Sequence, residues 1–246
     1  MKLEAKNLNF RYTPASRLIL RDFNVRVSEG EFVSLLGPSG CGKSTFLNVL
    51  AGILTDYEGE IFIDGERITG MSGHFAYMPQ NDLLLPWRTV LDNVCLYSEI
   101  HHNKKDVIDK AREQMVRFGL EGCEDKYPSE LSGGMRQRAA FLRTALCDAD
   151  ILLLDEPFGA LDVITRGQLQ DWLYELCQEL NRTVLLVTHD TDEAIYLSDR
   201  ILVLGQPGEG IRDEITISEP DRNRDWLYAQ GDLRARIHRI ISNEQH

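Results

Sequence analysis

The stretch that decides the fold is Phe32-Val33-Ser34-Leu35-Leu36, followed at once by Gly37-Pro38-Ser39-Gly40-Cys41-Gly42-Lys43-Ser44. The first five residues are mostly apolar and predict a buried strand. The next eight match the phosphate-binding pattern GxxxxGK(S/T), and an amphipathic helix pattern follows. A strand, a glycine-rich loop and a helix in this order make nucleotide binding the leading hypothesis.

Each residue type in this loop has a physical reason. Glycines allow positive φ angles, so successive N–H groups converge on a phosphate while the next helix presents the positive end of its dipole. Lys43 supplies a charge for the β- and γ-phosphates, and Ser44 offers a hydroxyl to Mg²⁺. The residues expected to bind nucleotide here are Gly37, Pro38, Ser39, Gly40, Cys41, Gly42, Lys43, Ser44 and Thr45. A kinase, a GTPase or a transporter motor would each fit this loop.

Composition limits the class of protein. The 246 residues are 43% hydrophobic and 27% charged, which is typical of a globular protein able to bury a full core. No apolar run approaches the roughly 18 residues that span a bilayer, and the amino terminus lacks the pattern of a secretory signal. We therefore expect residence in the cytosol.

Charge and cysteine content exclude several partners. The formal net charge of −12 opposes binding to nucleic acid or to an anionic lipid surface, so docking at a membrane would need a protein receptor. The five cysteines form no CxxC pair, which argues against a disulfide framework or a zinc site.

Hydrophobic patterns along the chain predict an α/β protein with a helical insertion. Short strands are expected before residue 36, including Leu18-Ile19-Leu20, and a strand at 60–65 ends in an Asp-Gly turn signal. Helical spacing dominates from about 82 to 150, for instance at 104–118. Three short aliphatic runs, at 151–154, 183–187 and 201–204, are typical of parallel strands covered on both faces.

Two adjacent carboxylates follow the first of these aliphatic runs. Asp155 and Glu156 would lie at the carboxyl end of a buried strand, where phosphate sites of open α/β sheets are found. Asp155 would hold Mg²⁺, and Glu156 would polarise the water that attacks the γ-phosphate.

The segment Leu131-Ser132-Gly133-Gly134-Met135 resembles the LSGGQ signature of ATP-binding cassette (ABC) ATPases, with Met135 where that consensus often has Gln. Ser132, Gly133 and Gly134 would form an exposed helix start whose N–H groups and hydroxyl face an anion.

Four further positions match the family in the same chain order. Tyr12 resembles the aromatic residue that stacks on adenine, and Gln80 resembles the Q-loop residue that contacts the metal or the attacking water. Asp162, in Gly159-Ala160-Leu161-Asp162, matches the D-loop residue that faces the opposite subunit, and His189 matches the switch histidine that contacts the γ-phosphate. Glu156, His189 and Gln80 are thus the catalytic candidates, and Ser44, Gln80 and Asp155 the metal ligands.

The resemblance covers nearly the whole chain and implies an architecture. It implies a P-loop NTPase core with a mixed sheet, an antiparallel β subdomain and an inserted helical subdomain. Residues 1–81 and 151–246 would form the core with its β subdomain, and 82–150 the helical subdomain that carries the signature. In this family each ATP lies between the loop of one subunit and the signature of the other, so the resemblance implies a dimer, with homodimer and heterodimer both open.

The region after Gln80, Asn81 to Val94, resembles bacterial importer ATPases of the nitrate, sulfonate and taurine type. That implies a motor on the cytoplasmic face of the cell membrane, with an integral permease and, indirectly, a solute-binding protein as partners and no nucleic acid. An exporter motor and a soluble non-transport ABC ATPase are the alternatives. Leu84, Leu85 and Trp87 would either receive a permease helix or belong to the core, and the transported solute cannot be read from the sequence.

Overall fold

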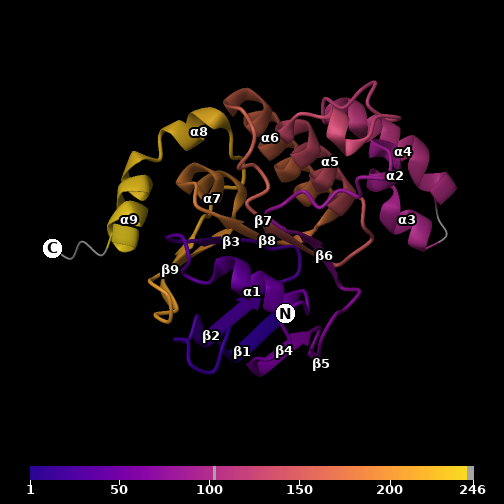
Figure 1. The fold of residues 1–246 in the computed structure, drawn as a ribbon. Coiled ribbons are helices and arrows are strands. Elements are labelled where there is room, and N and C mark those ends of the chain that lie inside the picture. Colours follow the sequence, from indigo (N-terminus) through magenta and orange to yellow (C-terminus); the bar gives the residue numbers. More distant parts are fainter. Residues whose placement is uncertain (102–103, 243–246) are drawn as a thin grey trace. The chain divides into compact units, whose positions relative to one another are not determined.

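The computed structural model describes residues 1–101 and 104–242, and the chain divides into two compact units. Unit 1 comprises Met1–Gly73 and Tyr174–His246, and unit 2 comprises His74–Leu173. The boundary falls inside the long helix α6, Val163–Leu180. Figure 1 gives the labels of the elements, and each unit is described by itself below.

The first part of unit 1 is an antiparallel sheet in the order β2-β1-β4-β5. Its strands are β1 (Leu3–Phe10), β2 (Leu20–Val27), β4 (Glu58–Ile63) and β5 (Glu66–Ile68). The predicted Asp-Gly turn joins β4 to β5, with Asp64 at φ 51° and Gly65 at φ 83°. The strand expected at 18–20 begins only at Leu20, because a turn and bends occupy most of 12–19, although the Ile19 N–H already donates to the Phe10 carbonyl of β1.

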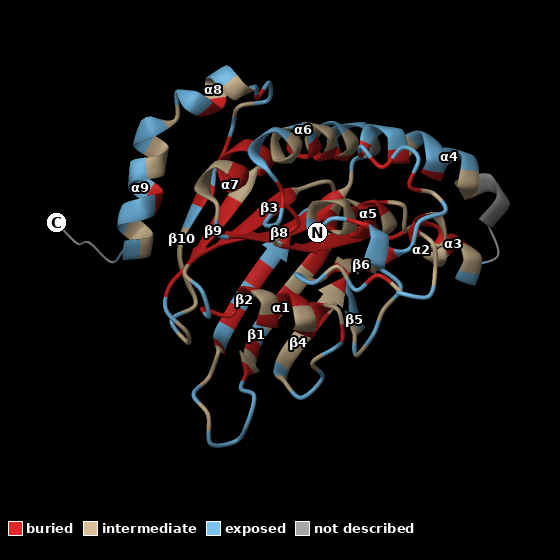
Figure 2. Cartoon of the chain, turned by 45° about the horizontal axis from the view of Figure 1, so that its top comes forward, coloured by how far each residue is buried: buried red, intermediate tan, exposed pale blue. Residues whose placement is uncertain are grey.

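The second sheet of unit 1 is mixed. Strands β9 (Arg200–Leu204), β3 (Phe32–Leu36) and β8 (Thr183–Thr188) run parallel with β3 between the other two, and β10 (Ile211–Thr216) pairs antiparallel with β9. Every residue of β3 and β8 is buried, as Figure 2 shows. The uninterrupted apolar runs therefore mark strands covered on both faces.

Four helices lie wholly within the described residues of unit 1. They are α1 (Lys43–Leu50), α7 (Thr191–Leu197), α8 (Arg224–Tyr228) and α9 (Gly231–Ser242). Phe46 of α1 packs against Phe23 of β2 at 4.9 Å between ring centroids. Helix α7 packs on β3 and β8, and α9 contacts both β9 and α7.

Unit 2 is mainly helical around one pair of parallel strands. Strand β6 (Phe75–Met78) pairs with β7 (Ile151–Asp155), and the helix predicted at 104–118 is α4 (Lys104–Arg117). The other elements are α2 (Val90–Val94), α3 (Leu96–Ile100), a 3₁₀ turn (Pro128–Glu130) and α5 (Gly133–Ala145). Edge-to-face contacts among aromatic rings form much of its core: Phe118, Phe141, Phe158 and Trp172.

Candidate nucleotide site

In unit 1, strands β3 and β8 end side by side. Leu36 of β3 pairs with Thr188 of β8 in a parallel register, so Gly37 and His189 are the first residues beyond two neighbouring strand ends. Ligands of open α/β sheets bind at the carboxyl ends of parallel strands. The sheet register therefore brings the phosphate loop and the predicted switch histidine to one edge.

The loop that leaves β3 has a backbone that requires glycine. Gly40 and Gly42 have φ angles of 78° and 112°, and a Cβ added to Gly42 would lie 3.1 Å from Ile19 Cγ2. Gly42 is also the N-cap of α1, and it has no side chain to accept from the first-turn amides. Amides at a helix start that no cap side chain engages are suited to bind an anion.

The side chain of Lys43 folds back onto this loop. Its side chain is buried, and Nζ donates to the carbonyls of Gly37 at 2.7 Å and Pro38 at 3.0 Å. Burial raises the pKa of the neighbouring Cys41 thiol, which keeps it neutral. The ammonium group of Lys43 thus contributes the positive charge of the loop.

Tyr12 lies beside the first turn of α1. Its hydroxyl hydrogen-bonds Thr45 Oγ1 at 3.0 Å, and its ring meets Phe10 edge-on at 5.1 Å. The residue is nevertheless 61% exposed. It also lines a hollow of about 290 Å³ with Arg11 and Tyr57. A ring fixed on one side and open on the other can act as a stacking surface.

His189 is exposed, and its backbone is fixed by a capping network that sequence reasoning missed. Thr188 Oγ1 donates to Glu193 Oε2 at 2.6 Å and accepts from the Asp190 N–H at 3.0 Å. Asp190 caps α7 by accepting from the N–H groups of Asp192 and Glu193. The signal was present in the sequence, because Asp190 followed three residues later by Glu193 is a capping-box spacing.

In unit 2, β6 and β7 repeat this arrangement. Met78 pairs with Leu154, so Gln80 and Glu156 each lie two residues beyond a matched pair of strand residues. Gln80 Nε2 donates to Glu156 Oε2 at 3.1 Å. The structure thus brings together two of the predicted catalytic residues, which are 76 positions apart.

The two carboxylates at the end of β7 differ in environment. Asp155 is 3% exposed, whereas Glu156 is partly exposed. Glu156 also has φ 49°, a left-handed conformation that costs a residue with a Cβ about 1 to 3 kcal/mol. Backbone strain of this kind concentrates at functional sites, where it turns a side chain in a required direction.

The signature segment forms the start of α5. Ser132 is the N-cap, and its Oγ accepts from the Met135 N–H at 3.3 Å. Ser132 and Gly133 are exposed. A Cβ added to Gly134 would lie 3.6 Å from the Ala160 carbonyl oxygen, so the signature lies close to the D-loop within unit 2.

Asp162 begins α6 as a capping residue. Its Oδ1 accepts from the Thr165 N–H at 3.0 Å, and hydrogen bonding to Thr165 holds the pKa of this exposed carboxyl below its ordinary value. The next two residues, Val163 and Ile164, are 82% and 75% exposed. The D-loop therefore carries a fixed negative charge beside an exposed apolar pair.

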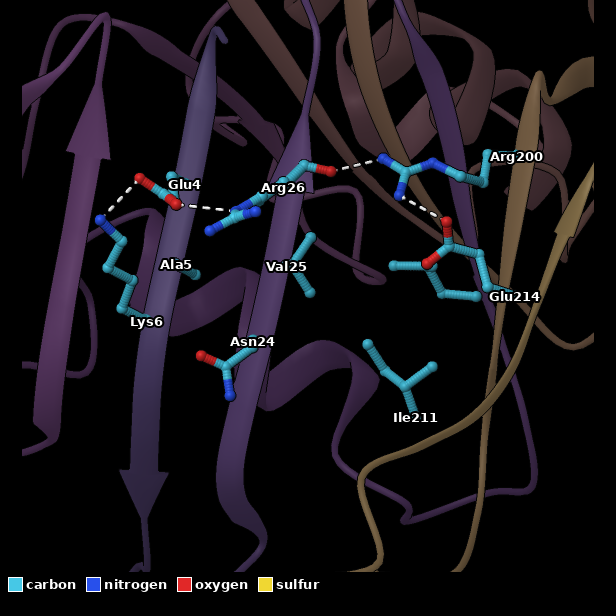
Figure 3. A pocket seen from close by; sticks show the side chains of 10 residues that line it. Glu4, Ala5, Lys6, Asn24, Val25, Arg26, Arg200, Ile211 and Glu214 are labelled. Carbon is cyan, nitrogen blue, oxygen red and sulfur yellow. Dashed lines mark hydrogen bonds and ion pairs between the residues drawn. The ribbon is translucent and has the colours of Figure 1, made fainter.

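A larger hollow of about 470 Å³ lies elsewhere in unit 1, among residues of β1, β2, β9 and β10. Figure 3 shows its charged groups joined to one another. Glu4 pairs with Lys6 and Arg26 at 2.8 Å, and Arg200 pairs with Glu214 at 3.0 Å. Because these charged side chains already pair with one another, the hollow offers a nucleotide less than the phosphate loop does.

Three other properties bear on cofactors and location. All five cysteines are free thiols, and no three His, Cys, Asp or Glu side chains of residues 1–101 and 104–242 group as a metal cluster. Over the same residues, no helix combines the length and the apolar character needed to traverse a lipid bilayer.

Comparison with known proteins decides the family. Residues 20–159, more than half of the chain, match the family model described as ABC transporter. The chain belongs to the ABC transporter family. Within it, the fold is the P-loop ABC ATPase fold, and the chain is an ATP-binding subunit with ATPase chemistry.

Several ABC relatives are closely similar. The aliphatic sulfonates import ATP-binding protein of Bacillus anthracis is 47% identical over 192 residues, which are 78% of this chain and 76% of that protein. An uncharacterized ABC transporter ATP-binding protein of Methanocaldococcus jannaschii is 42% identical over 99% of this chain and 92% of its own. The nitrate import ATP-binding protein of Synechococcus elongatus is 45% identical over 76% of this chain and 29% of that longer protein.

Two solved ABC cassettes share the fold. One is a dimeric post-hydrolysis state bound to ADP and Pi, with a TM-score of 0.77 at 28% identity over 88% of this chain and 99% of the other. The second, a dimeric structure of a bacterial ABC transporter cassette, gives a TM-score of 0.79 at 30% identity with the same coverage.

Proposed function

We propose that this chain is the ATP-hydrolysing motor of a bacterial ABC importer, in which ATP-driven closure of a dimer is coupled to solute uptake through a separate permease. The observation that carries the hydrolytic part is the hydrogen bond between Gln80 and Glu156 at the ends of β6 and β7. The printed names of the sulfonate and nitrate import relatives support the importer part.

Each predicted site residue receives a role in this proposal. The backbone of Gly37 to Thr45 and the charge of Lys43 bind the phosphates, Tyr12 stacks on adenine, and His189 contacts the γ-phosphate. Ser44, Gln80 and Asp155 are the proposed Mg²⁺ ligands, and their hydroxyl, amide and carboxylate oxygens are the hard donors that Mg²⁺ prefers. When bound, Mg²⁺ neutralises charge on the phosphate oxygens. Glu156 takes a proton from the attacking water, and Gln80 orients the Glu156 carboxylate.

The signature and D-loop residues are assigned to the neighbouring subunit's nucleotide. The chain contains one phosphate loop and one LSGG segment. Ser132 and Gly133 are exposed at the start of α5, which leaves them accessible to a second copy. We assign Ser132, Gly133, Gly134 and Asp162 to the nucleotide bound by the partner, so that two chains, in the simplest case identical, build two sites.

A surface in unit 2 suits the permease. Three residues near the start of unit 2 could belong to the core or to a docking surface, and they differ in exposure. Leu84 is buried, Leu85 is intermediate and Trp87 is 71% exposed. Leu83 is 60% exposed and has φ 43°, a conformation unfavourable for a residue with a Cβ. Arg143 donates to the Leu83 carbonyl at 2.8 Å and so helps to hold the segment in place.

Two exposed apolar side chains on a segment held by Arg143 are suited to contact another protein. We call Leu83 and Trp87 the docking pair and propose that a cytoplasmic segment of the permease covers it. A peripheral position on the cytoplasmic face of the membrane and an indirect link to a solute-binding protein follow from this assignment. An exporter motor or a non-transport ABC ATPase would need another partner at the same surface.

Two substitutions test the hydrolytic proposal. Glu156→Gln keeps the shape of the side chain and removes the base, so turnover should fall about 10²- to 10⁴-fold while ATP binding persists. The variant should also elute as a dimer on gel filtration with Mg·ATP. Lys43→Ala should instead weaken ATP binding in a titration. Unchanged turnover in Glu156→Gln, or unchanged ATP affinity in Lys43→Ala, contradicts the assigned role.

Membrane purification tests the transport proposal. A tagged chain carrying Glu156→Gln is purified from detergent-solubilised membranes, and the co-purifying proteins are identified by mass spectrometry. An integral permease supports an importer or exporter, and a solute-binding protein encoded with it supports the importer. Ribosomes or DNA in place of a membrane protein would overturn the transport assignment.

A further inference from the structure

The carboxyl-terminal helices of unit 1 are joined to the segment that carries His189. Arg234 of α9 forms an ion pair with Asp192 in the first turn of α7. The same guanidinium donates to the carbonyls of Leu227 at 2.7 Å and Tyr228 at 3.3 Å, at the end of α8. One side chain therefore connects α8, α9 and α7, which lie next to one another in Figure 1.

The connection continues from Asp192 toward His189. The Asp192 N–H donates to Asp190 Oδ1 at 2.8 Å, and Asp190 is the residue that follows His189. On the other side, the Asp190 N–H donates to Thr188 Oγ1 at 3.0 Å, so the backbone on both sides of the histidine belongs to one network. The residues on both sides of His189 are thus joined to the first turn of α7.

We propose that Arg234 is a positioning residue for His189: it holds Asp192 and thereby fixes the switch histidine from the carboxyl-terminal helix. This inference rests on the proposed contact between His189 and the γ-phosphate. Arg234 is about a quarter exposed and Asp192 about half exposed, so the pair retains more of its strength than a fully solvated one. The network gives α9 a role in turnover in addition to its packing on β9.

The chain contains a matched control for this ion pair. Arg236 of α9 pairs with Asp213 of β10 at 2.8 Å, two positions from Arg234, and it joins the same helix to an element that does not hold His189. Removing the Asp213 carboxylate therefore removes a comparable contact of α9 and leaves α7 untouched. If the ion pairs served only to anchor α9, loss of the Asp192 carboxylate and loss of the Asp213 carboxylate should change turnover equally.

The variants are Asp192→Asn, Arg234→Gln, Arg234→Lys and the control Asp213→Asn, in the full chain with Mg·ATP. For Asp192→Asn and Arg234→Gln we expect kcat to fall about 2- to 5-fold with the KM for ATP unchanged, which corresponds to about 0.4 to 1 kcal/mol at 1.36 kcal/mol per tenfold change. Arg234→Lys should recover part of the loss, and Asp213→Asn should match the wild type. Equal kcat in all variants, or equal losses in Asp192→Asn and Asp213→Asn, overturns the inference.

A spectroscopic measurement provides a readout that does not depend on turnover. The imidazole signals of a chain labelled with ¹³C-histidine are recorded, and His189→Ala identifies the signal of His189. Asp192→Asn should shift that signal, whereas Asp213→Asn should leave it in place; an unshifted signal in Asp192→Asn contradicts the inference. The His189→Ala variant also separates the two proposals. If it hydrolyses ATP normally, the proposed role of His189 fails, and if it is inactive while Asp192→Asn is normal, only the positioning role fails.

Discussion

Replacing Arg222 by Met should weaken the attachment of the carboxyl-terminal segment of unit 1 and lower the stability of the protein. The Arg222 side chain is 3% exposed and lies between the end of α7 and the start of α8. It donates to the carbonyls of Tyr196 at 3.2 Å, Ser198 at 2.7 Å and Glu219 at 3.0 Å, and to Asp199 Oδ1 at 2.8 Å. Met fills much of the same volume but offers no donor.

The size of the effect follows from which partners are buried. The hydrogen bonds to Tyr196 and Ser198 are buried, so each carbonyl left without this donor costs about 1 to 2 kcal/mol. The Asp199 side chain is 41% exposed, and its ion pair adds at most about 1 kcal/mol. The total is about 2 to 5 kcal/mol. At about 2 to 4 °C for each kcal/mol in a chain of this size, the Tm should fall by about 4 to 20 °C.

Thermal unfolding followed by circular dichroism, supported by hydrogen exchange of α8 and α9, measures this change. The control is Arg236→Met, because Arg236 is also an ion-paired arginine near the carboxyl terminus but is about half exposed. It should cost at most about 1 kcal/mol. A fall in Tm for Arg222→Met that is no larger than the fall for Arg236→Met would refute the reasoning from burial.

Two further predictions concern the nucleotide and the docking pair. Tyr12→Ala should raise the Kd for ATP about 5- to 150-fold because base stacking on an aromatic ring is worth about 1 to 3 kcal/mol, whereas Tyr12→Phe should bind ATP with less than a 5-fold change; equal affinities in isothermal titration would contradict the stacking role. Trp87→Ala should leave the Tm within about 2 °C of the wild type but reduce recovery of the permease from membranes, whereas Leu84→Ala should lower the free energy of unfolding by about 2 to 5 kcal/mol. If Trp87→Ala were the less stable variant, the observed burial would be contradicted.

The strands and the phosphate loop could be predicted because their sequence patterns have local causes. Residues 32–36 are an apolar run with no polar alternation apart from Ser34, and all five are buried in β3. Ser34 is accommodated by a hydrogen bond to Ser198, a partner 164 positions away. The pattern identified the strand, and only the fold could identify the partner.

The docking segment shows where local patterns stop being informative. Leu84 and Trp87 lie in one short apolar stretch, yet one is 7% and the other 71% exposed. Asn93 of α2 accepts from the Leu85 N–H at 2.7 Å and donates to the carbonyls of Leu85 and Thr89. Since these contacts set the path of an irregular segment, no helical or strand period could reveal which side chains face outward.

The positioning contacts were missed for a similar reason. In the sequence, Arg234 is one charge in an amphipathic helix pattern, and the same description fits an exposed residue such as Arg239. Its proposed role depends on α9 lying against α7, which brings it to Asp192 across 42 positions. Sequence patterns describe one element at a time, whereas ion pairs between elements require the tertiary arrangement.

The segment after β6 links the proposed docking pair to the proposed general base, Glu156, within unit 2. Gln80 holds Glu156, and two residues later Asp82 accepts from Arg136 Nε of the signature helix at 3.1 Å. Trp87 of the docking pair lies five residues beyond Asp82 on the same braced segment. In the proposed transporter, a permease bound at the docking pair would therefore contact the same segment that carries the contacts to the proposed general base and to the signature helix.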